Sequence, residues 1–484
     1  MTGPVTGSRG RIRPPDTTRE GLRRVVVIVV SVFVLALFGA LHWYVWRRLI
    51  RDTTPKGSFL RRAGSIVFVA GPLLSMAAMT AEGDGVPFLL QRILAWPGYL
   101  WLALFLYLLL ALLLGEAMRP VLRRWLAHRG AGGDARQRIR PTAQSAEVAE
   151  VQATDSDAEE LASADEPLTA TAHRGDSDAS ASRGTAPVTV LDPPHVSEPT
   201  LSAGSTAPTG PSRRLFVSRV VGGAAAAVAV GIVGYGTYGV LRGPKVKRLT
   251  VPLAKLPRSA HGFRIAVVSD IHVGPILGRG FAQRVVDTIN ATQPDLIAVV
   301  GDLVDGSVEN LTPAVEPLAG LRARHGAYFV TGNHEYISGA EPWIEKVREL
   351  GLRPLENART ELPGFDLAGV NDVRGEEEGQ GPDFGRALGD RDRSRAAVLL
   401  AHQPVVIDGA VRHGVDLQLS GHTHGGQLWP GNVLAALANP TVAGLERYGD
   451  TQLYVSRGAG AWGPPVRVGA PSDITVVELA SVQA

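Results

Sequence analysis

Histidine, aspartate and asparagine residues recur in the last half of this sequence, each of them just after a short apolar run. The stretch "SGHTHGGQLWP" (residues 420–430) places two of these histidines one residue apart in a glycine-rich turn. Imidazole nitrogens and carboxylate or amide oxygens bind divalent transition metals, and the absence of cysteine excludes thiolate ligands and a cysteine nucleophile. The pattern therefore indicates a metal site built from nitrogen and oxygen ligands.

The candidate metal ligands all share this position after an apolar run, and they are Asp270, His272, Asp302, Asn333, His402, His422 and His424. Taken singly, each has a simpler explanation, because a lone histidine is more often a solvated side chain and aspartate and asparagine are common in turns. Their joint occurrence favours the metal site. Three oxygen donors and four imidazoles are too many for one ion and suit two ions that share an aspartate.

The elements that must position these side chains are short strands that alternate with helices from about residue 249 to the end of the sequence. The run 263–270 predicts a buried strand, 281–292 a helix and 294–302 the next strand. Further strand-like runs are "AYFVTGNHE", "FDLAGVND", "AAVLLAHQP", "VDLQLSGHTH", "QLYVSRGAG" and "DITVVEL". This alternation predicts an α/β domain in which the loops at the strand ends converge on one site.

Five short motifs resemble those of the calcineurin-like metallophosphoesterases, and they occur in the same order as in that family. They are Asp270-Ile271-His272, "GDLVD" (301–305), "GNHE" (332–335), His402 and "GHTH" (421–424). The runs "LLAHQP", "SGHTHGGQ" and "YVSRGAGAWGPPVRVG" are similar to the bacterial membrane-attached branch of the family. The resemblance covers roughly the last half of the chain, and it implies a four-layer α/β/β/α sandwich.

The resemblance also implies a role for each residue of the site. The first metal ion would be held by Asp270, His272, Asp302 and His424, and the second by Asp302, Asn333, His402 and His422. His334 would be the catalytic residue that protonates the leaving oxygen or stabilises the phosphoryl group, and Asp305 would orient its ring. Two cations about 3.5–4 Å apart lower the pKa of a bridging water and so provide hydroxide for in-line attack on phosphorus. Oxygen and imidazole ligands without sulfur suit Mn, Zn or Fe, of which manganese or zinc is the expectation.

Long apolar runs in the first half of the chain predict membrane helices at residues 25–46, 64–81, 97–118 and 220–241, rather than buried helices of a soluble core. The chain is therefore divided into a basic N-terminal tail (1–24), about three transmembrane helices (25–118), a disordered acidic linker (119–212), a transmembrane or signal-anchor helix (213–243) and a metallophosphoesterase domain (249–484). Residues 141–211 carry 12 acidic residues against two arginines, which is typical of a flexible linker.

The distribution of lysine and arginine favours a multi-pass protein of the cell membrane whose catalytic domain is extracytoplasmic. Basic clusters lie at residues 9–24, 47–62 and 119–140 and around the fourth span. Placing the first loop and the linker in the cytoplasm leaves only the basic tail outside. Arg213 and Arg214 resemble a twin-arginine export signal, or else form an ordinary cytoplasmic flank, and both interpretations put that end of the span in the cytoplasm.

The sequence thus predicts a membrane-anchored phosphoesterase with two metal ions that hydrolyses a phosphate ester, preferably a phosphodiester. A lipid-linked or cell-wall phosphate compound is the expected substrate, because the spans would hold the site near the membrane. The pI of about 9.2 averages separate basic and acidic stretches, and no nucleic-acid-binding motif is present, so no nucleic-acid partner is expected. Two alternatives stay open: a cytoplasmic hydrolase with reversed orientation, and a non-catalytic sensor or receptor module that binds metal and phosphate.

Overall fold

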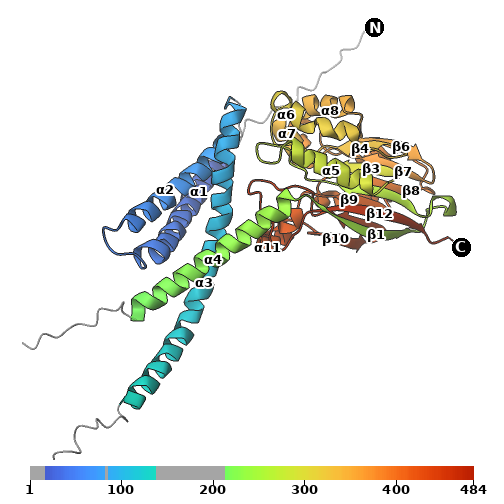
Figure 1. Cartoon of the computed structure of the whole chain (residues 1–484). Coiled ribbons are helices and arrows are strands. Elements are labelled where there is room, and N and C mark those ends of the chain that lie inside the picture. The colour runs from blue at the N-terminus through green and yellow to red at the C-terminus, as the bar shows by residue number, and fades with distance from the viewer. Residues whose placement is uncertain (1–16, 82–84, 138–212, 484) are drawn as a thin grey trace, which may run out of the picture. The chain divides into compact units, whose positions relative to one another are not determined.

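The computed structural model describes residues 17–81, 85–137 and 213–483 (Figure 1). Most of the predicted basic tail (1–24) and of the predicted acidic linker (119–212) lies outside these residues. By its internal contacts the chain divides into two compact units. Unit 1 is Met1–Pro120 with Arg213–Ala484, and unit 2 is Val121–Ser212.

Four helices in the described part of the chain are long and apolar enough to cross a membrane. They are α1 (Thr17–Trp46), α2 (Phe59–Ala81), α3 (Phe88–Gln137) and α4 (Arg213–Leu241). Each of the four predicted spans falls within one of them. A π-helical turn, η1 (Arg47–Arg51), extends α1, and α3 continues through residues 119–137, which the sequence analysis assigned to the linker.

Charged side chains join three of these helices at one end of the bundle. Arg48 Nε lies 2.9 Å from Glu116 Oε1 of α3, and Arg119 Nη2 lies 3.4 Å from the same oxygen. At the start of α4, Arg219 Nε donates to the carbonyl of Thr53 at 3.0 Å. This charged end lies near the beginning of α4, whereas the domain with the two sheets follows the other end of that helix.

Two six-stranded mixed sheets form the domain that follows α4. The first has the strand order β1-β12-β2-β3-β4-β5, and the second has the order β10-β11-β9-β8-β7-β6. The strands are β1 (Lys245–Leu253), β2 (Phe263–Val268), β3 (Leu296–Val300), β4 (Ala327–Val330), β5 (Arg353–Pro354), β6 (Ala358–Leu362), β7 (Phe365–Gly369), β8 (Ala396–Leu400), β9 (Leu417–Ser420), β10 (Gly444–Tyr448), β11 (Thr451–Val455) and β12 (Asp473–Ser481). The sheet begins at Lys245, slightly before the predicted domain start at 249.

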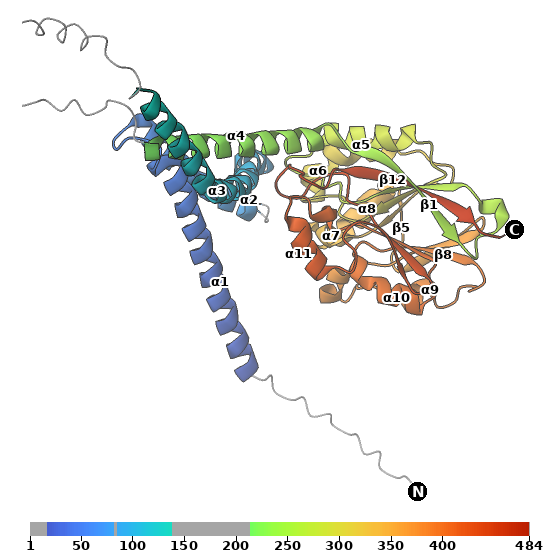
Figure 2. The same ribbon diagram turned by 90° about the horizontal axis from the view of Figure 1, so that it is seen from below.

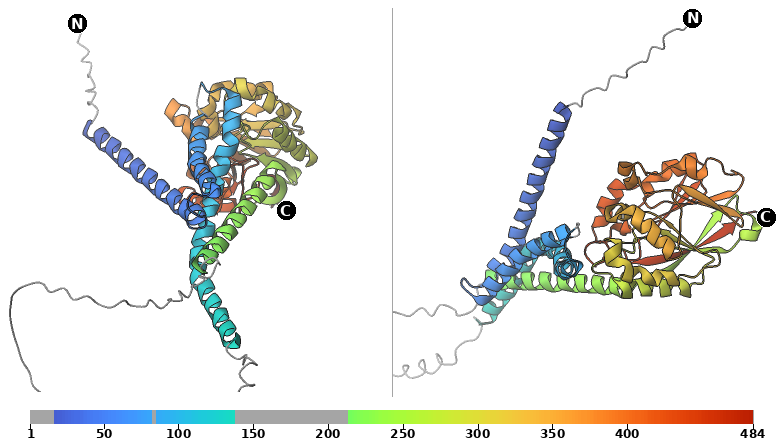
Figure 3. Two further views of the ribbon diagram at one scale, coloured as in Figure 1. Left: turned by 60° about the vertical axis from the view of Figure 1, so that its left-hand side comes forward. Right: turned by 90° about the horizontal axis from the view of Figure 1, so that it is seen from above.

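Helices cover the outer face of each sheet (Figure 3). The α-helices of the domain are α5 (Arg279–Ala291), α6 (Val308–Val315), α7 (Asn333–Ser338), α8 (Ala340–Glu349), α9 (Phe384–Leu388), α10 (Ile407–Arg412) and α11 (Gly431–Ala438). The short 3₁₀ helices are η2 (Arg258–Ala260), η3 (Glu316–Gly320), η4 (Val373–Glu378), η5 (Pro404–Val406) and η6 (His424–Gly426).

The alternation of side chains along the strands produces three apolar layers. In β3, Ile297 and Val299 face the core shared with α5, α6 and α8, whereas Leu296, Ala298 and Val300 face the core between the two sheets. On the far side of the second sheet, β8 and β11 pack against α9 and α10. A strand buried on both faces explains the continuous apolar runs in the sequence. The predicted four-layer α/β/β/α sandwich is confirmed.

The strand directions bring one set of loops together. β2, β3 and β4 run parallel to one another in the first sheet, and β7, β8 and β9 do so in the second. Because the carboxyl ends of parallel strands lie at the same edge of a sheet, the loops that follow these strands meet at one end of the sandwich.

Candidate metal centre

All nine predicted site residues lie at this edge, in the loops that follow the strands or at the start of the helices after them. Asp270 and His272 follow β2, Asp302 and Asp305 follow β3, Asn333 and His334 begin α7 after β4, His402 follows β8, and His422 and His424 follow β9. Three groups of histidine and carboxylate side chains lie close enough to share an ion, and they include every predicted residue except Asn333. Asn333 joins them through its Oδ1, which is 2.9 Å from His422 Nδ1.

The backbone at five of the seven predicted ligands is left-handed. The residues with φ between 51° and 71° are Asp270, His272, Asp302, His422 and His424. Such a conformation costs roughly 1–3 kcal/mol at a non-glycine residue and persists where the surrounding structure enforces it. The turns after β2, β3 and β9 are therefore bent so that their side chains point toward one place.

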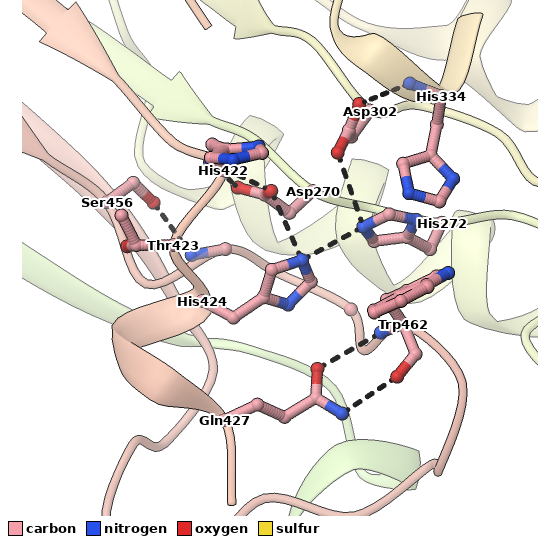
Figure 4. Close-up of polar contacts among 12 residues, drawn as sticks. Asp270, His272, Asp302, His334, His422, Thr423, His424, Gln427, Ser456 and Trp462 are labelled. Carbon is pink, nitrogen blue, oxygen red and sulfur yellow. Dashed lines mark hydrogen bonds and ion pairs between the residues drawn. The ribbon is translucent and has the colours of Figure 1, made fainter. Parts of the chain in front are cut away.

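The first group contains Asp270, His272, Asp302 and His424, all of them buried. Two imidazole nitrogens face each other, because His272 Nε2 and His424 Nε2 are 3.0 Å apart (Figure 4). Asp270 Oδ1 lies 3.3 Å from His424 Nε2, and Asp302 Oδ2 lies 3.8 Å from His272 Nε2. Two nitrogens and two carboxylates that converge in this way suit a divalent ion of the transition series.

The second group contains Asp302, His402 and His422, with Asn333 beside them. His402 Nδ1 donates to the carbonyl of Val300 at 2.9 Å, so Nε2 is the ring atom that is placed to bind an ion. This Nε2 atom is buried, lies 3.1 Å from Asp302 Oδ2, and has no hydrogen-bonding geometry to any described residue. A buried nitrogen in that position fits a metal ion, and Asp302 is the residue that both groups share.

Asp305 contacts two histidines with a single oxygen. Its Oδ1 is 2.8 Å from His272 Nδ1 and 2.8 Å from His334 Nδ1. The first contact holds a proton on His272 Nδ1 and turns Nε2 toward the first group. The second contact fixes the ring of His334, which lies beside the candidate metal ligands and remains partly exposed.

The surrounding charges and burial shift the pKa values of His334 and His422 in opposite directions. Burial alone would lower the pKa of His334, but the hydrogen bond and charge of Asp305 outweigh it and raise the pKa to about 9. Burial and the charge of His402 lower the pKa of His422 to about 4. For Asp302, the neighbouring histidines overcome the effect of burial and hold its pKa well below its usual range. At neutral pH His422 is thus neutral, as a metal ligand would have to be, while His334 keeps its proton.

The sequence analysis did not single out Glu335, although it lies in the quoted motif "GNHE". Its carboxylate is fully buried and accepts three backbone hydrogen bonds, from Gly332, Asp302 and Leu303 at 2.6, 3.0 and 2.8 Å. These bonds tie the loop after β4 to the loop after β3. Glu335 therefore holds the turn that presents Asp302.

Arg467 is a second residue whose position the sequence analysis did not predict, because arginine side chains are usually exposed. The structure buries it, with 6% of its surface exposed. Its Nη1 donates to the carbonyl of His424 at 3.0 Å, and its Nη2 lies 3.2 Å from His424 Nδ1. Arg467 thus supports a predicted metal ligand and is shielded from solvent.

Arg467 also connects the site to a candidate membrane span. The Cβ of a residue larger than glycine at position 236 of α4 would lie 2.8 Å from the Arg467 carbonyl and 2.7 Å from Val466 Cγ1. The glycine therefore allows α4 to contact the segment that carries Arg467. Figure 2 shows α4 leading to the edge of the domain.

Comparison with known proteins agrees with this geometry. A family model described as calcineurin-like phosphoesterase matches residues 263–426, which contain all nine predicted site residues. A protein of Danio rerio named "Transmembrane protein with metallophosphoesterase domain" is 39% identical over 259 residues, which cover 51% of this chain and 59% of that protein.

Two bacterial relatives match the same half of the chain. An uncharacterized metallophosphoesterase of Helicobacter pylori is 39% identical over 247 residues, covering 50% of this chain and 66% of that protein. One of Aquifex aeolicus is 33% identical over 240 residues, covering 49% of this chain and 91% of that protein. The matched region thus spans less than two thirds of the first two relatives and nearly all of the third.

Proposed function

Because the chain belongs to the calcineurin-like metallophosphoesterase family, we propose that it is a membrane-anchored hydrolase that cleaves phosphodiesters at a centre of two divalent metal ions. The observation that carries the proposal is the position of Asp302, whose carboxylate belongs to both groups of candidate ligands. A carboxylate shared in this way suits a bridged pair of ions.

We assign the first ion to Asp270, His272, Asp302 and His424, and the second to Asp302, Asn333, His402 and His422. Manganese, zinc or iron suits these donors. When bound, the two ions would supply Lewis acidity, which activates a water and neutralises charge on the phosphoryl oxygens. The buried Nε2 of His402 and the facing nitrogens of His272 and His424 support the assignment.

His334 is the proposed general acid of the reaction. Its ring lies beside His272, with the two ring centroids 4.7 Å apart, and its Nδ1 contacts Asp305. Since its pKa is raised to about 9, the imidazolium form persists at neutral pH and has a proton to donate. Hydrolysis breaks one phosphorus–oxygen bond, and the proton of His334 passes to the leaving oxygen.

We further propose that the domain lies outside the cytoplasm. Three arginines lie at the charged end of the bundle, namely Arg48, Arg119 and Arg219. The positive-inside rule favours a cytoplasmic location for this end. The domain follows the other end of α4 and would then lie on the opposite side of the membrane. An alkaline phosphatase fused after Ala484 is expected to be active, and an inactive but expressed fusion would contradict this orientation.

The enzymatic proposal is tested with the full chain in lipid nanodiscs. After loading with manganese, the protein is expected to hydrolyse bis-p-nitrophenyl phosphate, and chelation followed by re-addition of metal should abolish and restore turnover. The Asp302→Asn variant is the control for a contaminating phosphatase. A folded sample that shows no turnover with manganese, zinc or iron would refute the proposal.

A further inference from the structure

An uncharged apolar helix lies beside the candidate metal centre with no residue buried. In α11 (Gly431–Ala438), Val433, Leu434 and Leu437 are 57%, 71% and 82% exposed, and Trp429 just before the helix is 55% exposed. Residues 427–445 contain no charged side chain. Large apolar side chains clustered on the surface of a soluble domain mark a site of contact with a membrane or another protein.

The segment that leads into α11 is attached to a candidate membrane span. The hydroxyl of Tyr107 in α3 donates to the carbonyl of Trp429 at 3.0 Å. Leu428 and Val468 pack against the apolar cluster that α3 and α4 form with side chains such as Leu112 and Val233. In Figures 1 and 2, α11 lies on the side of the domain that faces α3. The exposed face of α11 is therefore continuous with the surface of helices that are apolar enough to cross a membrane.

The same segment reaches the metal centre. Its preceding turn, η6, contains the candidate ligand His424, and a Cβ at Gly426 would lie 2.2 Å from the backbone nitrogen of Asn432 in α11. Little movement of α11 is possible without moving that turn. The apolar face and the site are thus parts of one rigid loop-and-helix segment.

Trp462 contacts both the segment that leads into α11 and the proposed acid His334. Gln427 binds its backbone through two hydrogen bonds, from Gln427 Nε2 to the Trp462 carbonyl at 2.9 Å and from the Trp462 N–H to Gln427 Oε1 at 3.1 Å (Figure 4). The indole ring lies 5.7 Å from the ring of His334 and is 51% exposed. Exposed tryptophan is the side chain that favours the boundary between lipid and water.

We propose that α11, Trp429 and Trp462 enter the surface of the lipid bilayer, and that the substrate is a phosphodiester of a membrane lipid whose headgroup reaches the metal centre from the bilayer. This inference rests on the proposed hydrolase activity, and it adds the source of the substrate. A lipid is favoured over a protein partner because the face is uncharged and continuous with the membrane helices. The apolar chains of the lipid remain in the bilayer while its phosphate enters the site.

Two p-nitrophenyl esters with the same leaving group compare lipid and soluble substrates. Dioleoylphosphatidyl-p-nitrophenol is embedded in nanodiscs of phosphatidylcholine that contain the full chain, and bis-p-nitrophenyl phosphate is added in solution. In both, water adds to phosphorus and the bond to p-nitrophenol breaks, which leaves phosphatidic acid in the first case. The Leu434→Glu/Leu437→Glu variant is expected to lower kcat/KM for the lipid at least tenfold and to change that for the soluble ester less than twofold. Val411→Glu, at another exposed apolar position on α10, should change neither.

A second measurement does not depend on activity or on the charged variant. Because the chain has no cysteine, a nitroxide can be attached at Leu434→Cys alone, and Val411→Cys serves as the control. At position 434 the label should collide faster with oxygen, which is lipid-soluble, than with a water-soluble nickel chelate, and the order should reverse at position 411. A label at position 434 that is accessible to the chelate, or protected from both reagents as in a protein contact, would overturn the inference.

The two proposals fail separately in these experiments. If neither ester is hydrolysed, the proposed function is refuted while the label still reports on lipid. If the soluble ester is hydrolysed but the α11 variant lowers both rates equally, or neither, the membrane-lipid substrate is refuted and the hydrolase remains.

Discussion

Asp305 Oδ1 lies 2.8 Å from His334 Nδ1. The carboxylate therefore fixes the orientation of the imidazole ring through Nδ1 and leaves Nε2 as the nitrogen that can contact a substrate. The same oxygen contacts His272, a proposed metal ligand, at the same distance. One carboxylate thus orders both a proposed acid and the metal centre, and the two roles can be separated by substitution.

Replacement of His334 by alanine should lower kcat without removing metal. General acid catalysis contributes roughly a hundred- to ten-thousandfold, so a loss in that range is expected with bis-p-nitrophenyl phosphate. Metal content per chain, measured by mass spectrometry, should match that of the wild type. His261→Ala, at an exposed position elsewhere in the domain, is the control. Full activity in His334→Ala would remove this residue from the mechanism and favour a binding role for the site.

Replacement of Asp305 by alanine should affect both functions. The variant loses the hydrogen bond to His334 and also the bond that turns His272 toward the first ion. Loss of a residue that orients a metal ligand typically costs ten- to a hundredfold in metal affinity or activity. A metal titration followed by activity assays should therefore reveal weaker metal binding in this variant but not in His334→Ala. Identical metal affinity in the two variants would argue that the Asp305–His272 contact does not support metal binding.

The two groups of ligands predict a metal stoichiometry. The wild type should bind two ions per chain, and His402→Ala should retain the first, because His402 contributes only to the second group. Asp302→Asn should weaken both sites, since its carboxylate is shared. Chelation should lower the unfolding temperature, because a metal that binds only the folded state stabilises it by mass action. Binding of one ion by the wild type under saturating metal would contradict the dinuclear assignment.

Replacement of Glu335 by glutamine should destabilise the domain. The buried carboxylate accepts three backbone hydrogen bonds, and an amide would place its own N–H groups opposite one or more of these donors. A buried donor left without a partner costs about 1–3 kcal/mol. The midpoint of denaturant unfolding should fall accordingly, while Glu345→Gln, on the exposed side of α8, should leave it unchanged. Equal midpoints would indicate that the loop rearranges to accept the amide.

Replacement of Gly236 by alanine tests the coupling between α4 and the site. The added Cβ would clash with the segment Val466–Arg467, and Arg467 supports His424. A loss of affinity for the first metal ion is therefore expected. Gly231→Ala, in the same helix, is the matched control. A Cβ at that position has no neighbouring atom within 4 Å apart from the adjacent backbone of its own helix. Equal metal affinity in the two variants would contradict the coupling.

The sequence by itself determined the family, the sandwich of strands and helices, and the nine residues that could do chemistry. This was possible because the proposed metal ligands belong to short motifs in which residue type and spacing reflect local geometry, such as the left-handed turn at Asp270 and His272. The apolar runs that form buried strands and the four candidate membrane spans are likewise local features, which can be recognised from length and composition.

Only the tertiary structure decided which residues support that chemistry from a distance. Glu335, Arg467 and Gly236 act through backbone groups or close approach between segments that are far apart in the chain, and such contacts leave no periodic pattern in a sequence. The exposed face of α11 is a similar case. The sequence analysis made no prediction for these residues, and only the fold shows that none of them is buried. Burial depends on the whole arrangement of elements, and residue type alone does not establish it.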